Sequence, residues 1–132
     1  MRRHKEHITL TKSEMEIMSI LWSMDEGMGS VRDILEHYGN PKPAYTTVST
    51  FLRILTQKGF VESVKREGEG KTFNYRPLIS QDDYRRRAFD EMKNSMFNGS
   101  AKSLVSFFMQ QEEISPAEVE ELLQMIKQQP QL

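Results

Sequence analysis

The chain has 132 residues, of which 28% are charged and 37% hydrophobic, and its formal net charge is −1. This composition suits a soluble protein with modest cores and excludes a disordered chain. The absence of cysteine excludes disulfides, thiolate metal sites and cysteine nucleophiles. No apolar run approaches the roughly 20 residues that cross a bilayer. We therefore expect a cytoplasmic protein with no membrane partner.

Two helices are predicted near the N-terminus. Thr11 and Glu14 have the spacing of a capping box, and apolar residues behind them recur at helical intervals, which predicts a helix over 12–23. Residues 30–39 repeat this arrangement with a serine cap, apolar positions and a glycine at the expected end.

The third predicted helix, "AYTTVSTFLRILTQKGF" over 44–60, raises a question about its composition. Threonine is a poor helix former, yet four of the first seven residues are Thr or Ser. At about 100° per residue, one side of the helix is apolar and is expected to be buried; it consists of Val48, Phe51, Leu52 and Leu55. The opposite side carries Thr46, Ser49, Thr50, Arg53 and Gln57.

A β-hairpin is predicted to follow this helix. The strand-like runs over 60–67 and 71–78 are separated by Gly68-Glu69-Gly70. Three helices followed by a hairpin are the element order of a winged helix-turn-helix domain. Between Lys42 and Arg76 the chain has seven basic and three acidic residues, a local balance of +4 that favours an anionic partner.

The hydroxyl-rich side of the third helix is suited to DNA. Small hydroxyls allow close approach and can donate to phosphate oxygens or base edges, and an arginine can contact phosphate or guanine. The expected DNA-binding residues are Thr46, Thr47, Ser49, Thr50 and Arg53 on the helix and Lys65, Arg66, Lys71 and Thr72 on the hairpin. The alternatives are an incidental threonine-rich surface, a solvated edge hairpin, and a winged helix that serves as a protein-interaction adaptor.

The region from residue 80 onward is again predicted to be helical, and its last helix begins with the capping sequence Ser115-Pro116-Ala117-Glu118. About 50 residues cannot easily bury its many apolar side chains, whereas a two-fold dimer would bury them. The alternative is packing on the chain's own N-terminal domain. The expected dimerisation residues are Phe89, Leu104, Val105, Phe107, Phe108, Val119, Leu122, Leu123 and Ile126.

No catalytic, metal or cofactor site is expected. His4 and His7 have a spacing that suits metal on a helix, but they lie in the N-terminal arm without further ligands, and no nucleophile stands with a base. Arg85-Arg86-Arg87 span most of a helical turn and cannot share one face. A solvated helix, with one arginine paired to Asp82, Asp83 or a phosphate, is the preferred interpretation over a nucleic-acid site.

The motifs "TKSEMEIMSILW", "YTTVSTFLRILTQKGFV", "KTFNYRPLIS" and "NGSAKSLVSFFMQQEEISPAEVEELLQMI" resemble the BlaI/MecI/CopY family of bacterial repressors. The resemblance covers nearly the whole chain. It implies an N-terminal winged helix, a C-terminal helical dimerisation domain, and repression by a homodimer on pseudo-palindromic operator DNA.

Two departures from this family are visible. The penicillinase and methicillin-resistance repressors are inactivated by a regulatory protease at an Asn-Phe bond, and the matching dipeptide here is Phe107-Phe108. The copper-responsive branch uses C-terminal cysteines, which this chain lacks. The predicted fold is mostly α with a small β-hairpin, comprising a winged helix-turn-helix domain over 1–79 and a C-terminal helical dimerisation domain over 80–132.

Overall fold

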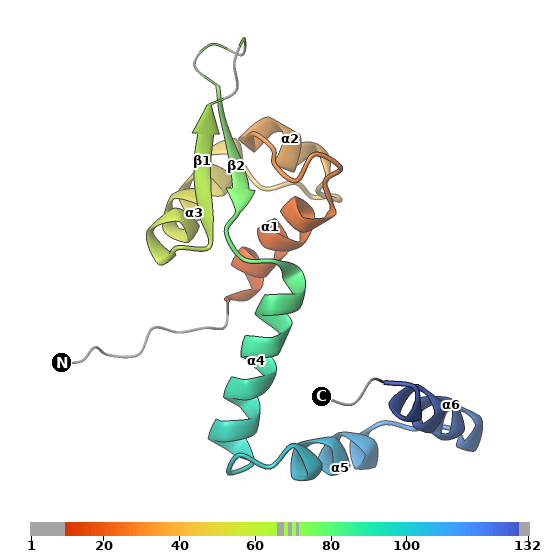
Figure 1. Ribbon diagram of the computed structural model, residues 1–132. Coiled ribbons are helices and arrows are strands. Elements are labelled where there is room, and N and C mark those ends of the chain that lie inside the picture. Colours follow the sequence, from red (N-terminus) through yellow and green to blue (C-terminus); the bar gives the residue numbers. More distant parts are fainter. Residues whose placement is uncertain (1–9, 66–67, 69, 71, 130–132) are drawn as a thin grey trace, which may run out of the picture. The chain divides into compact units, whose positions relative to one another are not determined.

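The computed structural model describes residues 10–65, 68, 70 and 72–129, and the chain divides into two compact units between Phe89 and Asp90 (Figure 1). The elements are α1 (Lys12–Ser23), α2 (Val31–Glu36), α3 (Tyr45–Lys58), β1 (Val61–Lys65), β2 (Phe73–Pro77), α4 (Gln81–Met96), α5 (Ala101–Gln111) and α6 (Pro116–Lys127). The predicted fold class, a winged helix followed by a helical C-terminal region, is confirmed.

The predicted caps form at the helix starts. The Glu14 backbone N–H donates to the Thr11 hydroxyl at 3.2 Å, and the Thr11 N–H donates to the Glu14 carboxylate at 2.9 Å. Ser115 and Glu118 cap α6 in the same way. Each box satisfies two N–H groups that have no partner inside the helix, which is why these starts were predictable from local sequence.

Helix α2 is shorter than predicted: it ends at Glu36, whereas the sequence pattern placed its end near Gly39. Side chains bind the carbonyl groups that a further turn would have used. The ammonium group of Lys42 donates to the Leu35 carbonyl at 2.6 Å, and Nδ1 of His37 lies 2.9 Å from the Asp33 carbonyl.

The hairpin follows directly from the end of α3. Gly59 adopts φ 85°, the left-handed conformation that ends a helix and that glycine adopts without a steric penalty. β1 and β2 pair antiparallel from Val61 opposite Pro77 to Lys65 opposite Phe73. Gly29 joins the outer side of β2, because its N–H and carbonyl both bond to Tyr75, at 3.0 and 2.8 Å.

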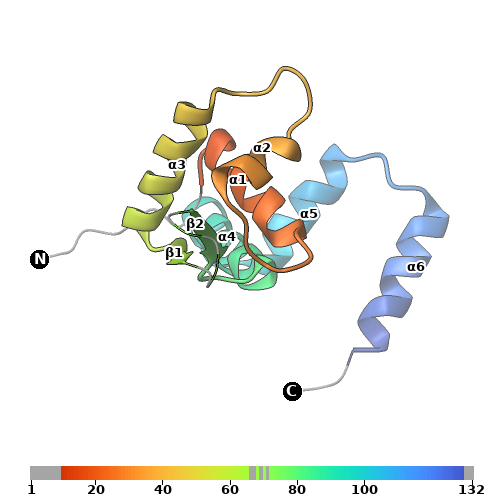
Figure 2. The same ribbon diagram turned by 90° about the horizontal axis from the view of Figure 1, so that it is seen from above.

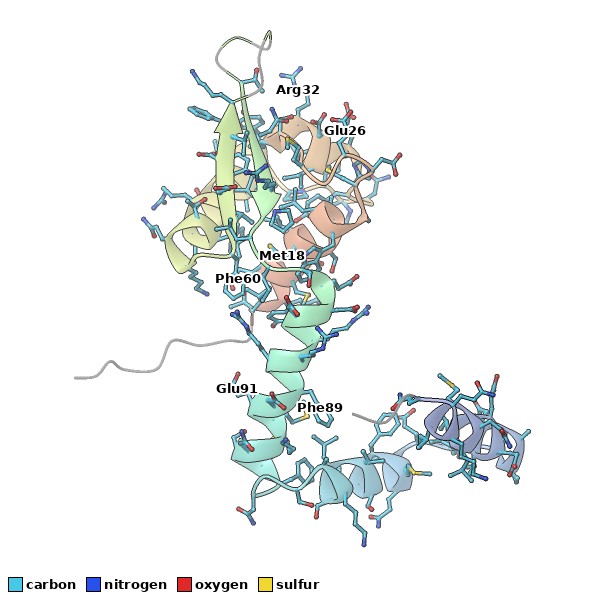
Figure 3. The ribbon with its side chains drawn as sticks, viewed as in Figure 1. Met18, Glu26, Arg32, Phe60, Phe89 and Glu91 are labelled. Carbon is cyan, nitrogen blue, oxygen red and sulfur yellow. The ribbon has the colours of Figure 1, made fainter. Side chains whose placement is uncertain are left out.

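The hydrophobic core lies in the N-terminal unit. Seen from above, α3 runs alongside α1 (Figure 2). Met18 and Phe60 mark the interior where α1 meets the chain leaving α3 (Figure 3). The buried apolar residues are Ile17, Met18, Leu21, Val31, Ile34, Val48, Leu52, Leu55, Phe60, Val61, Ile79 and Tyr84.

The first turn of α4 is anchored in this core. The Tyr84 ring packs against Trp22 and Phe60, with centroid distances of 5.9 and 6.2 Å. Its hydroxyl accepts the Leu10 backbone N–H at 2.7 Å, and the Trp22 indole N–H donates to the Ile79 carbonyl at 2.9 Å. The start of α4 is therefore part of the winged-helix unit.

The C-terminal unit is packed differently. Among its described residues, 90–129, none is buried. The Phe97 and Phe107 rings meet with centroids 5.8 Å apart, but most large apolar side chains remain exposed. In the described part of the chain, no helix is both long and apolar enough to cross a membrane.

Candidate nucleic-acid interface

Helix α3 has the two sides that its sequence predicts. Val48, Leu52 and Leu55 are at most 1% exposed, and Phe51 is half-buried against the same core. On the other side, Thr46, Thr50, Arg53 and Gln57 are exposed and Ser49 is half-buried. The apolar side holds the helix in place, so its hydroxyl-rich side is presented outward.

A groove separates this side of α3 from the hairpin. It has a volume of about 360 Å³. Its walls are formed by Ser49, Thr50, Arg53, Thr56 and Gln57 of α3 and by Ser63, Phe73 and Tyr75 of the hairpin. Three of the predicted DNA-binding residues are thus brought together beside the hairpin root.

The charges around the groove are fewer than the sequence suggests. Arg76 of β2 is bound to Glu62 of β1 at 2.6 Å, and Lys58 is bound to Glu14. Arg53 forms no hydrogen bond or ion pair with the described residues. Its guanidinium is therefore available to an anion or a base edge.

The hairpin cation Lys65 is held by an aromatic ring. Its ammonium lies 5.3 Å from the centroid of Phe73, its partner across the strands, in a cation–π contact. Phe73 is nevertheless 48% exposed. The predicted hairpin residues Arg66 and Lys71 lie outside the described residues.

The remaining predicted residues do not line this groove. Thr47 faces a separate concavity of about 310 Å³ with Pro41, Pro43 and Tyr38. Burial, and then the nearby charge of Glu16, raise the pKa of Tyr38 in that concavity. Thr46 is exposed at the start of α3.

Thr72 lines a third concavity, of about 690 Å³, between the hairpin and the starts of α2 and α3. Its other walls include Arg32 and Tyr45, neither of which was predicted as a site residue. Ser63, Phe73 and Tyr75 in the α3 groove were also not predicted. Of these residues, only Tyr45 could have been predicted from the sequence, because it directly precedes the threonine run. It occupies the first position of α3 and is 55% exposed.

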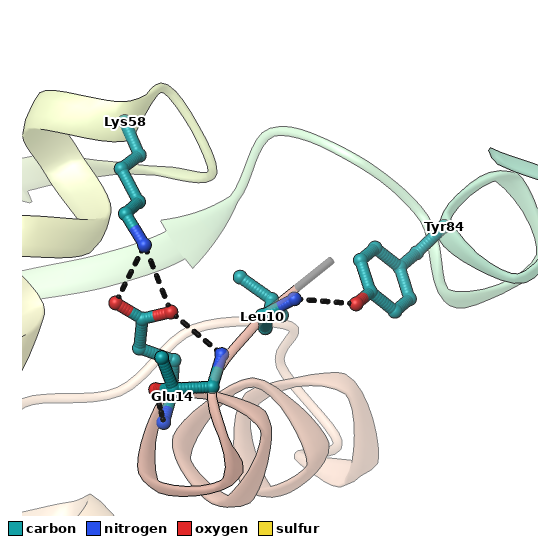
Figure 4. A network of polar contacts seen from close by, with 5 residues as sticks. Leu10, Glu14, Lys58 and Tyr84 are labelled. Carbon is teal, nitrogen blue, oxygen red and sulfur yellow. Dashed lines mark hydrogen bonds and ion pairs between the residues drawn. The ribbon is translucent and has the colours of Figure 1, made fainter. Parts of the chain in front are cut away.

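An ion pair between the buried Glu14 and the partly exposed Lys58 fixes the C-terminal end of α3 (Figure 4). Glu14 is 3% exposed and accepts two hydrogen bonds from Lys58, at 2.8 and 3.0 Å. Burial alone would raise the pKa of Glu14, but the bonds to Lys58 and Thr11 outweigh it, so the pKa lies below its ordinary value. The first turn of α1 and the last turn of α3 are thereby joined by a charged contact.

The C-terminal unit contains an extensive apolar surface. Phe107 and Phe108 of α5 are 52% and 53% exposed, and Leu122 and Leu123 of α6 are both 44% exposed. Val105 and Ile126 are exposed too, whereas Leu104 and Val119 are half-buried. Phe89 falls at the end of the N-terminal unit.

Other candidate groups have structural roles or lie outside the described residues. Arg85 and Arg86, two arginines rather than the one expected, pair with Asp82 and Asp83 at 3.2 and 2.7 Å on the exposed surface of α4. His4 and His7 precede the described residues. Within the described ranges, no three His, Asp or Glu side chains are grouped for a metal ion.

Comparison with known proteins identifies the family. The penicillinase repressor family model matches residues 10–128. The methicillin resistance regulatory protein MecI of Staphylococcus aureus (strain N315) is 29% identical over 114 residues, covering 86% of this chain and 89% of that protein. The penicillinase repressor of Bacillus licheniformis is 27% identical over 119 residues, covering 90% of both chains. The chain belongs to the penicillinase repressor family.

Proposed function

We propose that the protein is a transcriptional repressor that binds specific double-stranded operator DNA as a homodimer. Helix α3 enters the major groove, and the hairpin lies along the phosphate backbone of a pseudo-palindromic site. Residues 1–79 contact DNA and residues 80–132 form the dimer. No catalytic step, metal or cofactor is part of this function.

The observation that carries the proposal is the outward side of α3. Ser49, Thr50 and Arg53 line a groove beside the hairpin, and Arg53 has no counter-ion among the described residues. Hydroxyls bring the helix close to a base-pair edge, and a guanidinium can form two parallel bonds with guanine. The names of the relatives, which include penicillinase repressors, support the same role.

The dimer is supported by the unburied apolar surface of the C-terminal unit. Phe107, Phe108, Leu122 and Leu123 each leave more than two fifths of their surface exposed. A single chain gains nothing from holding these side chains in water, whereas a second copy would bury them. Two linked winged helices would then match the two halves of a palindromic operator.

Selection of bound sequences from random DNA tests the function. Recovery of an inverted repeat is the expected result, and that repeat then serves as the operator in gel-shift titrations over a range of salt. Combined substitution of Thr46, Thr50 and Arg53 by alanine should remove selective binding. Loss of Arg53 alone should cost about 1–3 kcal/mol if it contacts a base.

The matched control is Lys12→Ala combined with Ser19→Ala, which changes exposed residues of α1 that line no part of the α3 groove. It should bind like the wild type. Unchanged operator binding by the triple variant would refute the assignment of α3. Absence of a sequence-selective complex at every salt concentration would favour the protein-interaction adaptor instead.

A further inference from the structure

Two concavities flank the root of the hairpin, and Phe73, Tyr75 and Ser49 line both of them. The first is the α3 groove, with a volume of about 360 Å³. The second, of about 690 Å³, lies between the hairpin and the starts of α2 and α3. Because they share three lining residues, the two concavities lie next to each other.

The second concavity is lined mainly by polar side chains, one of which is the positively charged Arg32. Its lining residues are Ser30, Val31, Arg32, Tyr45, Ser49, Thr72, Phe73 and Tyr75. Five of them carry aliphatic or phenolic hydroxyls, and none is acidic. A wall of hydroxyl donors with one guanidinium and no carboxylate suits an anion with several acceptor oxygens.

Arg32 is available to such an anion. It is exposed and forms no hydrogen bond or ion pair with the described residues. The neighbouring carboxylate of Asp33 accepts the Ser30 backbone N–H at 3.0 Å as part of the α2 cap. Figure 3 shows the Arg32 side chain projecting outward from α2, away from the core marked by Met18 and Phe60.

We propose that Arg32, together with the Tyr45 hydroxyl, binds a backbone phosphate of double-stranded DNA next to the bases that α3 contacts. This inference rests on the proposed function and adds a contact to it. The guanidinium fork matches two phosphate oxygens, and the phenol donates to the same group. The contact positions the protein on the duplex and carries no sequence information of its own.

A phosphate within DNA fits this site better than a free phosphate ion. A single exposed arginine holds a free anion weakly, because both are well hydrated. A phosphate of a duplex already bound at the adjacent α3 groove is presented at high effective concentration. The two concavities are adjacent, because Ser49, Phe73 and Tyr75 line both of them.

The first test compares the full-length wild type with Arg32→Gln on the selected operator and on unrelated DNA. Loss of one phosphate contact should reduce the slope of log affinity against log salt by about 1. We expect binding of both DNAs to weaken by a similar factor, about tenfold at low salt. The matched control is Lys12→Gln, an equal charge change at an exposed residue that lines neither concavity, and its slope should equal that of the wild type.

A second measurement locates the contact. Operators in which one phosphate at a time is replaced by a neutral methylphosphonate should include a position that weakens the wild type but leaves Arg32→Gln unaffected. Tyr45→Phe, which removes only the hydroxyl, should weaken binding by a smaller factor without changing the salt slope. Far-ultraviolet circular dichroism of each variant verifies that it is folded.

Three outcomes would overturn the inference while the proposed function stands. In the first, the wild type binds selectively but Arg32→Gln keeps its affinity and salt slope. In the second, Arg32→Gln changes the preferred bases, which would make Arg32 a base contact. In the third, inorganic phosphate at millimolar concentration and constant ionic strength saturates amide shifts around Arg32 without DNA, which would identify a small-anion site. A wild type without selective binding would instead overturn the proposed function.

Discussion

The two units of this chain solve the problem of apolar surface in opposite ways. Among its described residues, the winged-helix unit buries twelve apolar side chains, from Ile17 to Tyr84, in a core of its own. In the C-terminal unit, no described residue is buried, although α5 and α6 carry strongly apolar sides. The chain therefore removes the apolar side chains of the first unit from water but leaves those of the second unit exposed to it.

This difference separates two kinds of stability. A core closed within one chain contributes the same free energy at any protein concentration, whereas a surface covered by a second copy contributes only as far as the dimer forms. The unit proposed to contact DNA belongs to the first kind. The unit proposed to join two copies belongs to the second.

The largest expected effect breaks the proposed dimer. Leu122→Asp places a charge on the exposed apolar side of α6, which should give a monomer in sedimentation equilibrium. Operator affinity should fall by about 10²–10⁴-fold, because two linked binding units gain that much over one. Gln124→Asp, an equal charge change at another exposed residue of α6, is the control. If Leu122→Asp remains a dimer with wild-type operator affinity, the exposed apolar side of α6 does not form the dimer interface.

The next effect concerns the closed core. Leu52→Ala removes a fully buried side chain and should lower the free energy of unfolding by about 2–5 kcal/mol. Urea unfolding followed by the fluorescence of the single tryptophan, Trp22, measures it at two protein concentrations. The difference in free energy of unfolding between the wild type and Leu52→Ala should be the same at both protein concentrations. The exposed control Gln57→Ala should change stability by less than about 0.5 kcal/mol.

A smaller effect is expected from the ion pair that joins α1 to α3. At neutral pH, Glu14→Gln should cost about 1–2 kcal/mol, a value limited because the Lys58 side chain is 36% exposed and partly screened by solvent. The pKa of Glu14 is lowered in the folded state, so its contribution is present above the ordinary value of 4.5. As pH falls through the lowered pKa, that contribution is lost.

Urea unfolding at pH 7 and at about pH 3 measures this dependence. The stability gap between wild type and Glu14→Gln should narrow at the lower pH. Glu36→Gln, which removes an exposed carboxylate from the end of α2, is the control. A gap that stays constant with pH would show that Glu14 acts through packing rather than charge.

The smallest expected effect concerns the anchor of α4. Tyr84→Phe keeps the ring contacts with Trp22 and Phe60 but removes the acceptor of the Leu10 N–H, at a cost of about 1 kcal/mol. Tyr45→Phe, which removes an exposed hydroxyl, should leave stability unchanged. The Leu10 amide should exchange its hydrogen faster in Tyr84→Phe than in the wild type, because its hydrogen bond to the Tyr84 hydroxyl is lost. Equal exchange rates in the two proteins would show that this hydrogen bond does not contribute to stability.

Features set by neighbouring residues could be predicted from the sequence. The capping boxes of α1 and α6 depend on residues three positions apart, and the buried positions Val48, Leu52 and Leu55 follow from the helical period. The end of α2 could not be predicted in the same way. Lys42, which binds the Leu35 carbonyl, approaches it only after the chain has turned.

Features set by tertiary contacts were also missed. The sequence pattern predicts Glu14 only as a cap, yet it pairs with Lys58, 44 residues later. Nothing in local periodicity places Thr47 in a different concavity from Ser49, or brings Arg32 to the start of α3. The DNA-binding assignments themselves remain predictions, because a side chain's exposure shows its availability and not its ligand.

The backbone pairing of Gly29 with Tyr75 has a consequence for self-association. A two-stranded hairpin has two free edges, and an exposed edge can recruit a strand from another molecule. Gly29 occupies the middle of the outer edge of β2 with two hydrogen bonds. Intermolecular strand addition along β2 would have to displace Gly29, so this single residue blocks that edge of the hairpin against edge-to-edge association at high protein concentration.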